Sequence, residues 1–174
     1  MKQIITISIL VLLSFFSLAQ QEGSYEDSVL YLEPQTVEAD LEMYTPPSSF
    51  EVSPAFNGYL DKAHGAGVIM MFITNLHYVR LVEGMNDEFF AKNNLNFVSE
   101  KDFESEHGYK GKIYKFNFIH NNSKFIRYMV YAGDSSGTLW LTITYNEIVE
   151  EILELDILDS LNSINIKVGG NAGN

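Results

Sequence analysis

The chain has 174 residues, no cysteine, 11 Lys and Arg residues and 23 Asp and Glu residues, which gives a formal net charge of −12. The length allows one domain or at most two, and a hydrophobic content of 46% excludes a disordered chain. The acidic balance argues against nucleic acid or an anionic membrane as the main partner, and the lack of cysteine excludes disulfides, thiol catalysis and cysteine-ligated metals.

Residues 1–19 carry the pattern of a secretory signal peptide. Lys2 precedes an apolar run over Ile4–Phe16, and Ser17-Leu18-Ala19 places small residues at the −3 and −1 positions of a cleavage site. The run is shorter than the roughly 20 apolar residues that a membrane-spanning helix needs. An uncleaved N-terminal anchor is the weaker alternative. We therefore expect an exported protein, periplasmic or secreted, with no membrane insertion after signal cleavage.

The rest of the chain divides into a leader, a folded domain and a tail. Residues 20–29 are mostly polar and predict a flexible leader, whereas residues 168–174 are rich in Gly and Asn and predict a disordered tail. Between them there is no low-complexity linker and no internal repeat. We expect a single α+β domain over residues 30–167.

The first half of this domain predicts short strands and a capped helix. In chain order we expect an edge strand over Val37–Met43, a short strand over Phe50–Val52, an apolar strand over Gly67–Thr74, an ambiguous segment over Asn75–Gly84 and a helix over 86–93. Gly67–Thr74 is almost continuously apolar, which is typical of a strand covered on both faces. Asn86-Asp87 supplies the N-terminal cap of the helix.

From Phe97 onward the apolar residues recur with a period of two. We expect a charged edge strand over Phe97–Phe103 and then alternating strands over Lys112–Ile119, Lys124–Tyr131 and Thr138–Tyr145. Turn residues at Asn121-Asn122 and Asp134–Gly137 join the last three strands. The fold class that follows is α+β, an antiparallel β-sheet meander with helices packed on it.

The C-terminal segment predicts two short helices. Ile148, Ile152 and Leu155 share one helical face, but the apolar residues that follow at steps of three would wind around a single straight helix. We therefore place a break near Leu155–Asp156, with Asp156 as the N-cap of the second helix. The apolar stripe of that helix comprises Ile157, Leu158, Leu161 and Ile164.

No group of side chains in the sequence points to catalysis or to a cofactor. The four histidines stand in different local contexts and form no HExxH motif or helical pair: His64, His77, His107 and His120. No serine lies in a G-x-S-x-G motif, and Gly65-Ala66-Gly67 precedes a strand, whereas a phosphate-binding loop precedes a helix. We predict no catalytic, cofactor-binding or metal-binding residues, and a protein that is not an enzyme.

The aromatic residues are numerous, with 10 Tyr, 12 Phe and one Trp. Most of them fall on alternating strand faces, where packing in the core is the default interpretation. Trp140 faces away from Leu139 and Leu141. It therefore lies either under the C-terminal helices or along a cleft.

The order of these elements resembles the PsbP-like family. Tyr44-Thr45-Pro46-Pro47 precedes the two strands of the first half, and a helix, a three-stranded meander and an Ile-Leu-x-Ser-Leu-x-Ser-Ile helix over Ile157–Ile164 follow. The resemblance covers residues 42–165 and implies a PsbP-like α/β/α sandwich. Members of this family include thylakoid-lumen photosystem subunits, a Ran-binding nuclear protein and exported bacterial proteins, mostly described as binding or accessory proteins. None of the family's functional residues has a match here.

These observations favour an exported, non-catalytic binding or accessory domain that interacts with another protein. The alternative is a carrier that holds a small apolar or aromatic ligand in a pocket between sheet and helices. The C-terminal helical segment carries six acids and no Lys or Arg: Glu147, Glu150, Glu151, Glu154, Asp156 and Asp159. This acidic helical face either keeps the protein soluble or meets a cationic partner surface.

The signal peptide provides a first test. We expect the mature protein to begin at Gln20, because cleavage follows Ala19. Intact mass spectrometry of the protein recovered from its native host measures this directly. Recovery of a protein that retains residues 1–19 would contradict the prediction.

Overall fold

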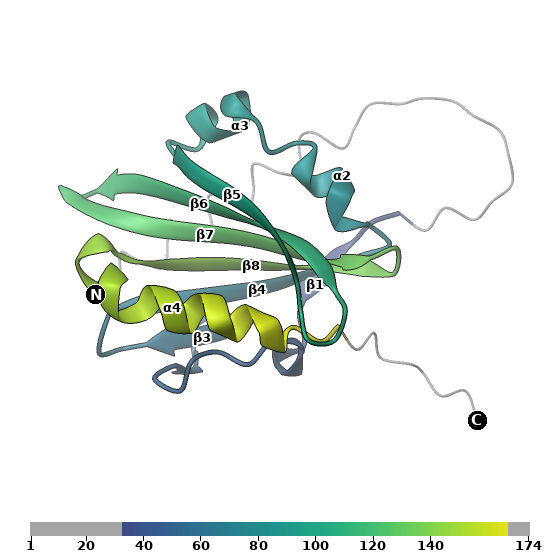
Figure 1. Cartoon of the computed structure of the whole chain (residues 1–174), viewed down its shortest axis with the longest axis horizontal. Helices are drawn as coiled ribbons and strands as arrows, with labels where there is room; N and C mark the ends of the chain where they lie inside the picture. The colour runs from purple at the N-terminus through teal and green to yellow at the C-terminus, as the bar shows by residue number, and fades with distance from the viewer. Residues whose placement is uncertain (1–32, 167–174) are drawn as a thin grey trace, which may run out of the picture. The chain divides into compact units, whose positions relative to one another are not determined.

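The computed structural model describes residues 33–166. The predicted signal peptide, leader and tail lie outside the described residues. Within them, eight strands form one antiparallel sheet in the order β2-β3-β4-β8-β7-β6-β5, with β1 paired to β4 (Figure 1). The strands are β1 Thr36–Glu38, β2 Glu51–Val52, β3 Gly58–Asp61, β4 Ala66–Thr74, β5 Asn96–Glu104, β6 Lys110–His120, β7 Ser123–Asp134 and β8 Gly137–Asn146.

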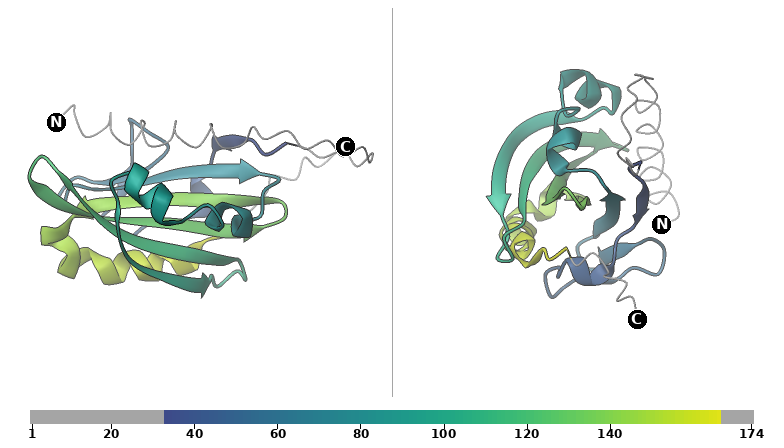
Figure 2. Two further views of the ribbon diagram at one scale, coloured as in Figure 1. Left: turned by 90° about the horizontal axis from the view of Figure 1, so that it is seen from above. Right: turned by 90° about the vertical axis from the view of Figure 1, so that its right-hand side faces the viewer.

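The helices of the described chain are short and lie on both faces of the sheet. They are α2 Tyr78–Val82, α3 Asp87–Lys92 and α4 Glu150–Ser160, together with the single turns of 3-10 helix η2 Leu41–Met43, η3 Glu147–Val149 and η4 Leu161–Ser163. Figure 2 gives two further views of this arrangement. No helix within residues 33–166 is long and apolar enough to cross a membrane.

The predicted meander is confirmed as strands β6, β7 and β8. Asn121 and Asn122 adopt positive φ angles of 48° and 60° in the β6–β7 turn, a conformation that Asn tolerates better than most residues. In the β7–β8 turn, Asp134 Oδ1 accepts hydrogen bonds from the backbone N–H and the hydroxyl of Ser136, at 2.8 and 2.6 Å. These local interactions set the register in which the strands pair.

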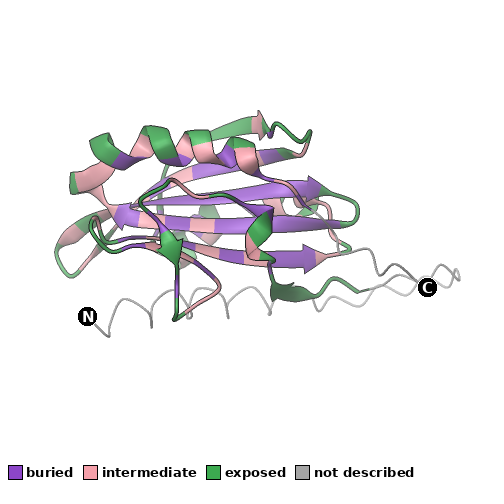
Figure 3. Ribbon diagram, turned by 90° about the horizontal axis from the view of Figure 1, so that it is seen from below, coloured by how far each residue is buried: buried purple, intermediate pink, exposed green. Residues whose placement is uncertain are grey.

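One face of the sheet packs against α4. Val130 on β7, together with Leu139 and Leu141 on β8, is fully buried beneath Leu153 and Ile157 of the helix. Figure 3 shows the resulting alternation of buried and exposed residues along α4 above the buried strands. This layer is the main hydrophobic core, because transfer of these side chains out of water drives folding.

The opposite face is covered in part by the α2–α3 segment. Asn86 caps α3 as predicted, since its side-chain oxygen accepts a hydrogen bond from the Phe89 N–H. Phe90 of α3 packs on Phe116, with ring centroids 5.0 Å apart. Trp140 stacks on Tyr131 on this same face, so the first of the two alternatives for Trp140, a position under the C-terminal helices, is wrong.

The first half of the chain differs from expectation in two places. The segment expected to be one edge strand over Val37–Met43 is a strand over Thr36–Glu38 followed by a 3-10 turn that Asp40 caps. Strand β3 was not expected, because it is short and follows a turn signal. Its existence depends on pairing with β4, a contact that local sequence does not encode. The ambiguous segment contains α2.

The C-terminal segment corrects the prediction of two short helices. Residues 150–160 form one continuous helix, so the expected break near Leu155–Asp156 is wrong. The helix buries Leu153 and Ile157, whereas Ile152 and Leu155 are exposed. Leu153 and Ile157 share a face at a spacing of four, which keeps the buried stripe straight. The apparent winding came from counting the exposed residues as part of that stripe.

Two substitutions in α4 distinguish its two sides. Ile157→Ala should lower the free energy of unfolding by about 2–5 kcal/mol, because it leaves a cavity at a fully buried position. Ile152→Ala should change it by less than about 0.5 kcal/mol, because the side chain is exposed. Urea denaturation of both variants measures the difference. A larger loss for Ile152→Ala would mean that the assigned orientation of α4 is wrong.

Candidate functional site

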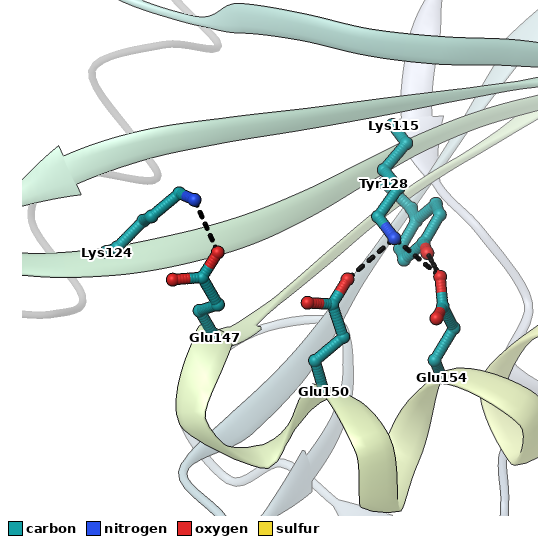
Figure 4. A network of polar contacts seen from close by, with 6 residues as sticks. All are labelled: Lys115, Lys124, Tyr128, Glu147, Glu150 and Glu154. Carbon is teal, nitrogen blue, oxygen red and sulfur yellow. Dashed lines mark hydrogen bonds and ion pairs between the residues drawn. The ribbon is translucent and has the colours of Figure 1, made fainter.

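The inner side of α4 is held to the sheet by a network of charges (Figure 4). Lys115 of β6 points toward the helix, and its Nζ lies 2.6 Å from Glu150 Oε1 and 2.6 Å from Glu154 Oε1. The hydroxyl of Tyr128 on β7 donates a 2.5 Å hydrogen bond to the same oxygen of Glu154. At the start of the segment, Lys124 Nζ lies 2.5 Å from Glu147 Oε1.

The hydrogen bonds and charges of this network outweigh the cost of its partial burial. Burial alone would lower the pKa of Lys115, but the hydrogen bonds and charges of Glu150 and Glu154 outweigh it and raise that pKa above its usual value. The hydrogen bonds from Lys115 and Tyr128 hold the pKa of Glu154 below its usual value. Both partners are therefore charged across the physiological pH range. The network attaches α4 electrostatically as well as through its apolar side.

In the structure, the six acids of the predicted acidic helical face fall into a paired group and an exposed group. Three of its acids are paired with lysines of the sheet: Glu147, Glu150 and Glu154. The other three are exposed to solvent: Glu151, Asp156 and Asp159. Two lysines thus pair with three of the six acids, so part of the negative charge of this face is neutralised within the chain.

The outer side of the segment carries an apolar ridge. Ile148, Ile152 and Leu155 are 85%, 60% and 73% exposed, and together we call them the outer ridge. On α4, at about 100° per residue, Ile152 and Leu155 lie about 60° apart around the helix axis, and Ile148 lies in the preceding turn η3. Glu151 and Asp156 lie about 40° to either side of the ridge by the same geometry. The helix thus presents a narrow apolar stripe bordered by acids.

The histidines do not converge. His77 caps α2 by accepting a hydrogen bond from the Val79 N–H, and His64 Nδ1 lies 2.7 Å from the buried carboxylate of Asp61. Burial opposes ionisation of Asp61, but hydrogen bonds, with that from His64 first among them, outweigh it and hold its pKa below the usual value. The backbone N–H of Ala63 also donates to Asp61. These contacts close the turn between β3 and β4. No group of three metal-ligating side chains occurs among residues 33–166.

Sequence reasoning missed three features of these surfaces. Lys115 alternates with Tyr114 and Phe116 along β6, so its direction toward the helix side of the sheet was available from the period of two. The sequence placed the outer-ridge residues on one helical face but did not indicate that this face is exposed. Arg127 falls in the middle of an apolar face on β7. In each case the sequence offered an indication, because the polarity of the residue differs from the polarity expected for its face of the strand or helix.

Comparisons with known proteins bear on the fold. Neither a family model nor a curated protein sequence matches this chain. Among solved structures the chain is similar to PsbP of the cyanobacterium Synechocystis, with a TM-score of 0.53 and 7% identity over 83% of this chain and 98% of that one. It is also similar to LpqN, involved in cell envelope biogenesis of Mycobacterium tuberculosis, with a TM-score of 0.46 and 10% identity over 76% and 80% of the two chains. A Pseudomonas aeruginosa protein of unknown function gives a TM-score of 0.45 and 9% identity over 87% and 95%.

The similarity to cyanobacterial PsbP shows that this chain has a PsbP-like fold. The predicted fold class is confirmed, because an antiparallel meander carries helices on both of its faces. At these identities the likeness concerns the fold and carries no residue assignment.

The charge network predicts a specific response to acid. Glu154 has a lowered pKa in the folded state, so its contribution to stability is present above the ordinary carboxyl pKa of about 4.3 and is lost as the pH falls through the lowered value. Glu154→Gln should therefore unfold more easily at pH 7, by about 1 kcal/mol, and lose less stability than the unmodified protein on acidification below about pH 5.

The matched control for this experiment is Glu151→Gln. Glu151 is exposed and forms no ion pair with any residue from 33 to 166. Urea denaturation at several pH values should give this variant the acid response of the unmodified protein. Equal responses of the Glu154 and Glu151 variants would show that the Lys115 network does not stabilise the fold.

Proposed function

We propose that this chain is an exported, non-catalytic domain that binds another protein through the outer ridge of α4. The observation that carries the proposal is the exposure of Ile148 in η3 and of Ile152 and Leu155 on the side of α4 that faces away from the buried Leu153 and Ile157. Single exposed apolar residues are common on protein surfaces, but aligned ones form a contiguous patch of the kind found at interfaces. The fold does not need these side chains, so their position calls for another explanation.

The chemistry of the ridge defines the partner. An amphipathic helix binds by laying its apolar side into a groove, with anchor residues spaced by three, four and seven positions. Ile148, Ile152 and Leu155 have these spacings. The acids Glu151 and Asp156 border the ridge and favour Lys or Arg at the rim of the groove. The partner is therefore a protein with an apolar groove and a cationic rim.

Two further observations support this role. The pattern of residues 1–19 predicts export, and the PsbP-like fold is one that the resemblance associates with binding and accessory proteins. The sequence alone suggested contact through the acidic helical face, whereas this proposal adds the apolar ridge. The acids at the ridge guide and orient the partner, whereas the apolar side chains supply most of the affinity, since burial of a large apolar side chain contributes about 1.5–3 kcal/mol.

Site-specific photocrosslinking in the native host tests the surface. A photoreactive residue placed at Ile152 or Leu155 should form a covalent product with one and the same protein. Val52 on β2 is the matched control position, because it is also 60% exposed. Products of equal size and yield from Val52 would contradict the proposal.

The affinity for the captured protein then tests the ridge directly. The double variant Ile152→Ser with Leu155→Ser should bind the partner about 10-fold more weakly or worse, with an unchanged melting temperature. Val52→Ser should bind normally. The association rate of the unmodified protein should fall as salt is added, because the acids contribute through long-range attraction. Undiminished binding by the double variant would exclude the ridge as the interface.

A further inference from the structure

The other face of the sheet contains a buried arginine. Arg127 lies in the middle of β7 on the face opposite α4, and only 5% of the residue is exposed. Its cross-strand neighbours are Phe116 on β6 and Thr144 on β8. Phe125 and Met129 precede and follow it on the same side of the strand. A cation therefore occupies a position where the pattern of the strand calls for an apolar residue.

The described residues accept few of the hydrogen bonds that this guanidinium can donate. Its Nε donates a 3.1 Å hydrogen bond to Thr144 Oγ1, and its central carbon lies 4.6 Å from the centroid of the Phe118 ring. A guanidinium has five N–H donors, so four remain without a hydrogen-bond acceptor among residues 33–166. No Asp or Glu within these residues forms an ion pair with Arg127, whereas Lys115 on the other face has two carboxylates.

The charge of Arg127 persists despite its burial. Burial lowers the pKa of Arg127 to about 10, so the side chain is still protonated at neutral pH. A buried charge is costly unless it is paired and hydrogen-bonded, and a single aromatic ring offsets only a part of that cost. An anion that accepts hydrogen bonds from the two terminal nitrogens of the guanidinium would offset this cost.

We propose that Arg127 binds the carboxylate of a small monoanionic ligand whose apolar or aromatic body lies against the neighbouring phenylalanines. Phe118 stacks on Phe125 with ring centroids 5.5 Å apart, which places an apolar surface beside the guanidinium. Thr144 is bound to Nε, so the terminal nitrogens are left for a bidentate carboxylate. This inference goes beyond the proposed docking role.

The number of charges selects a monocarboxylate over a phosphate. Among the described residues, Arg127 is the one cation in contact with the Phe118 ring. A single positive charge balances one carboxylate, whereas a dianionic phosphate would leave a negative charge unpaired in a protein of net charge −12. The site lies on the sheet face opposite the outer ridge. Binding at one site can therefore fail without affecting the other.

Calorimetric titration of the purified protein with decanoate tests the proposal. Decanoate supplies a carboxylate and an apolar chain, decanol supplies the chain alone, and inorganic phosphate supplies charge alone. We expect decanoate to bind about 10- to 100-fold more tightly than decanol, because the difference is a charge-assisted bidentate contact, and we expect no competition from phosphate. Equal binding of decanoate and decanol, displacement by phosphate, or no binding of decanoate would overturn the proposal.

Substitution of the arginine separates binding from structure. Arg127→Met should weaken decanoate binding about 10- to 100-fold and raise the melting temperature of the ligand-free protein, because it replaces an unpaired buried charge with an apolar side chain. The matched control is Arg80→Met on α2, where the arginine side chain is 72% exposed and binding should be unchanged. If Arg127→Met does not fold, Arg127→Lys retains the charge without the planar fork and should also bind more weakly. Unchanged affinity in both Arg127 variants would refute the site.

Discussion

The central strands of this protein are apolar on both faces, and this constraint determines the rest of the architecture. Val130 and Leu141 point to one side of the sheet, while Tyr131 and Trp140 point to the other, and all four are buried. A sheet of this kind needs a separate cover for each face. α4 provides the first cover and the α2–α3 segment contributes to the second, which makes the fold an α/β/α sandwich (Figure 1).

The position of Lys115 then explains how α4 is oriented. A cation on the α4 side of β6 attracts Glu150 and Glu154, and both of these acids lie on the inner side of the helix. Leu153 and Ile157 point into the core along the same side. Because the apolar contacts and the ion pairs specify one rotation of the helix, the remaining apolar residues are left facing solvent. The outer ridge is therefore exposed because the contacts of the inner side fix the rotation of α4.

Both candidate surfaces break the polarity pattern of their element. The outer ridge places apolar side chains in water, and Arg127 places a charge among aromatic rings. Natural sequences agree with their folds at most positions, and functional or strained sites are expected where polarity and burial disagree with the fold. The two surfaces lie on opposite sides of the sheet and would accept different chemistry. The first is proposed to bind a protein groove with a cationic rim, and the second is proposed to bind a small carboxylate.

The sequence alone determined the elements whose signals are local. The meander followed from side chains alternating with a period of two, its turns from Asn121-Asn122 and Asp134–Gly137, and α3 from the cap at Asn86. Only the tertiary structure decided which side of α4 is buried, since Ile148-Ile152-Leu155 and Leu153-Ile157 both have helical spacing. The choice depends on Lys115, which is 35 and 39 residues away from its two acids in the chain. Helical periodicity specifies that a stripe exists, whereas contacts between distant residues specify the direction in which it faces.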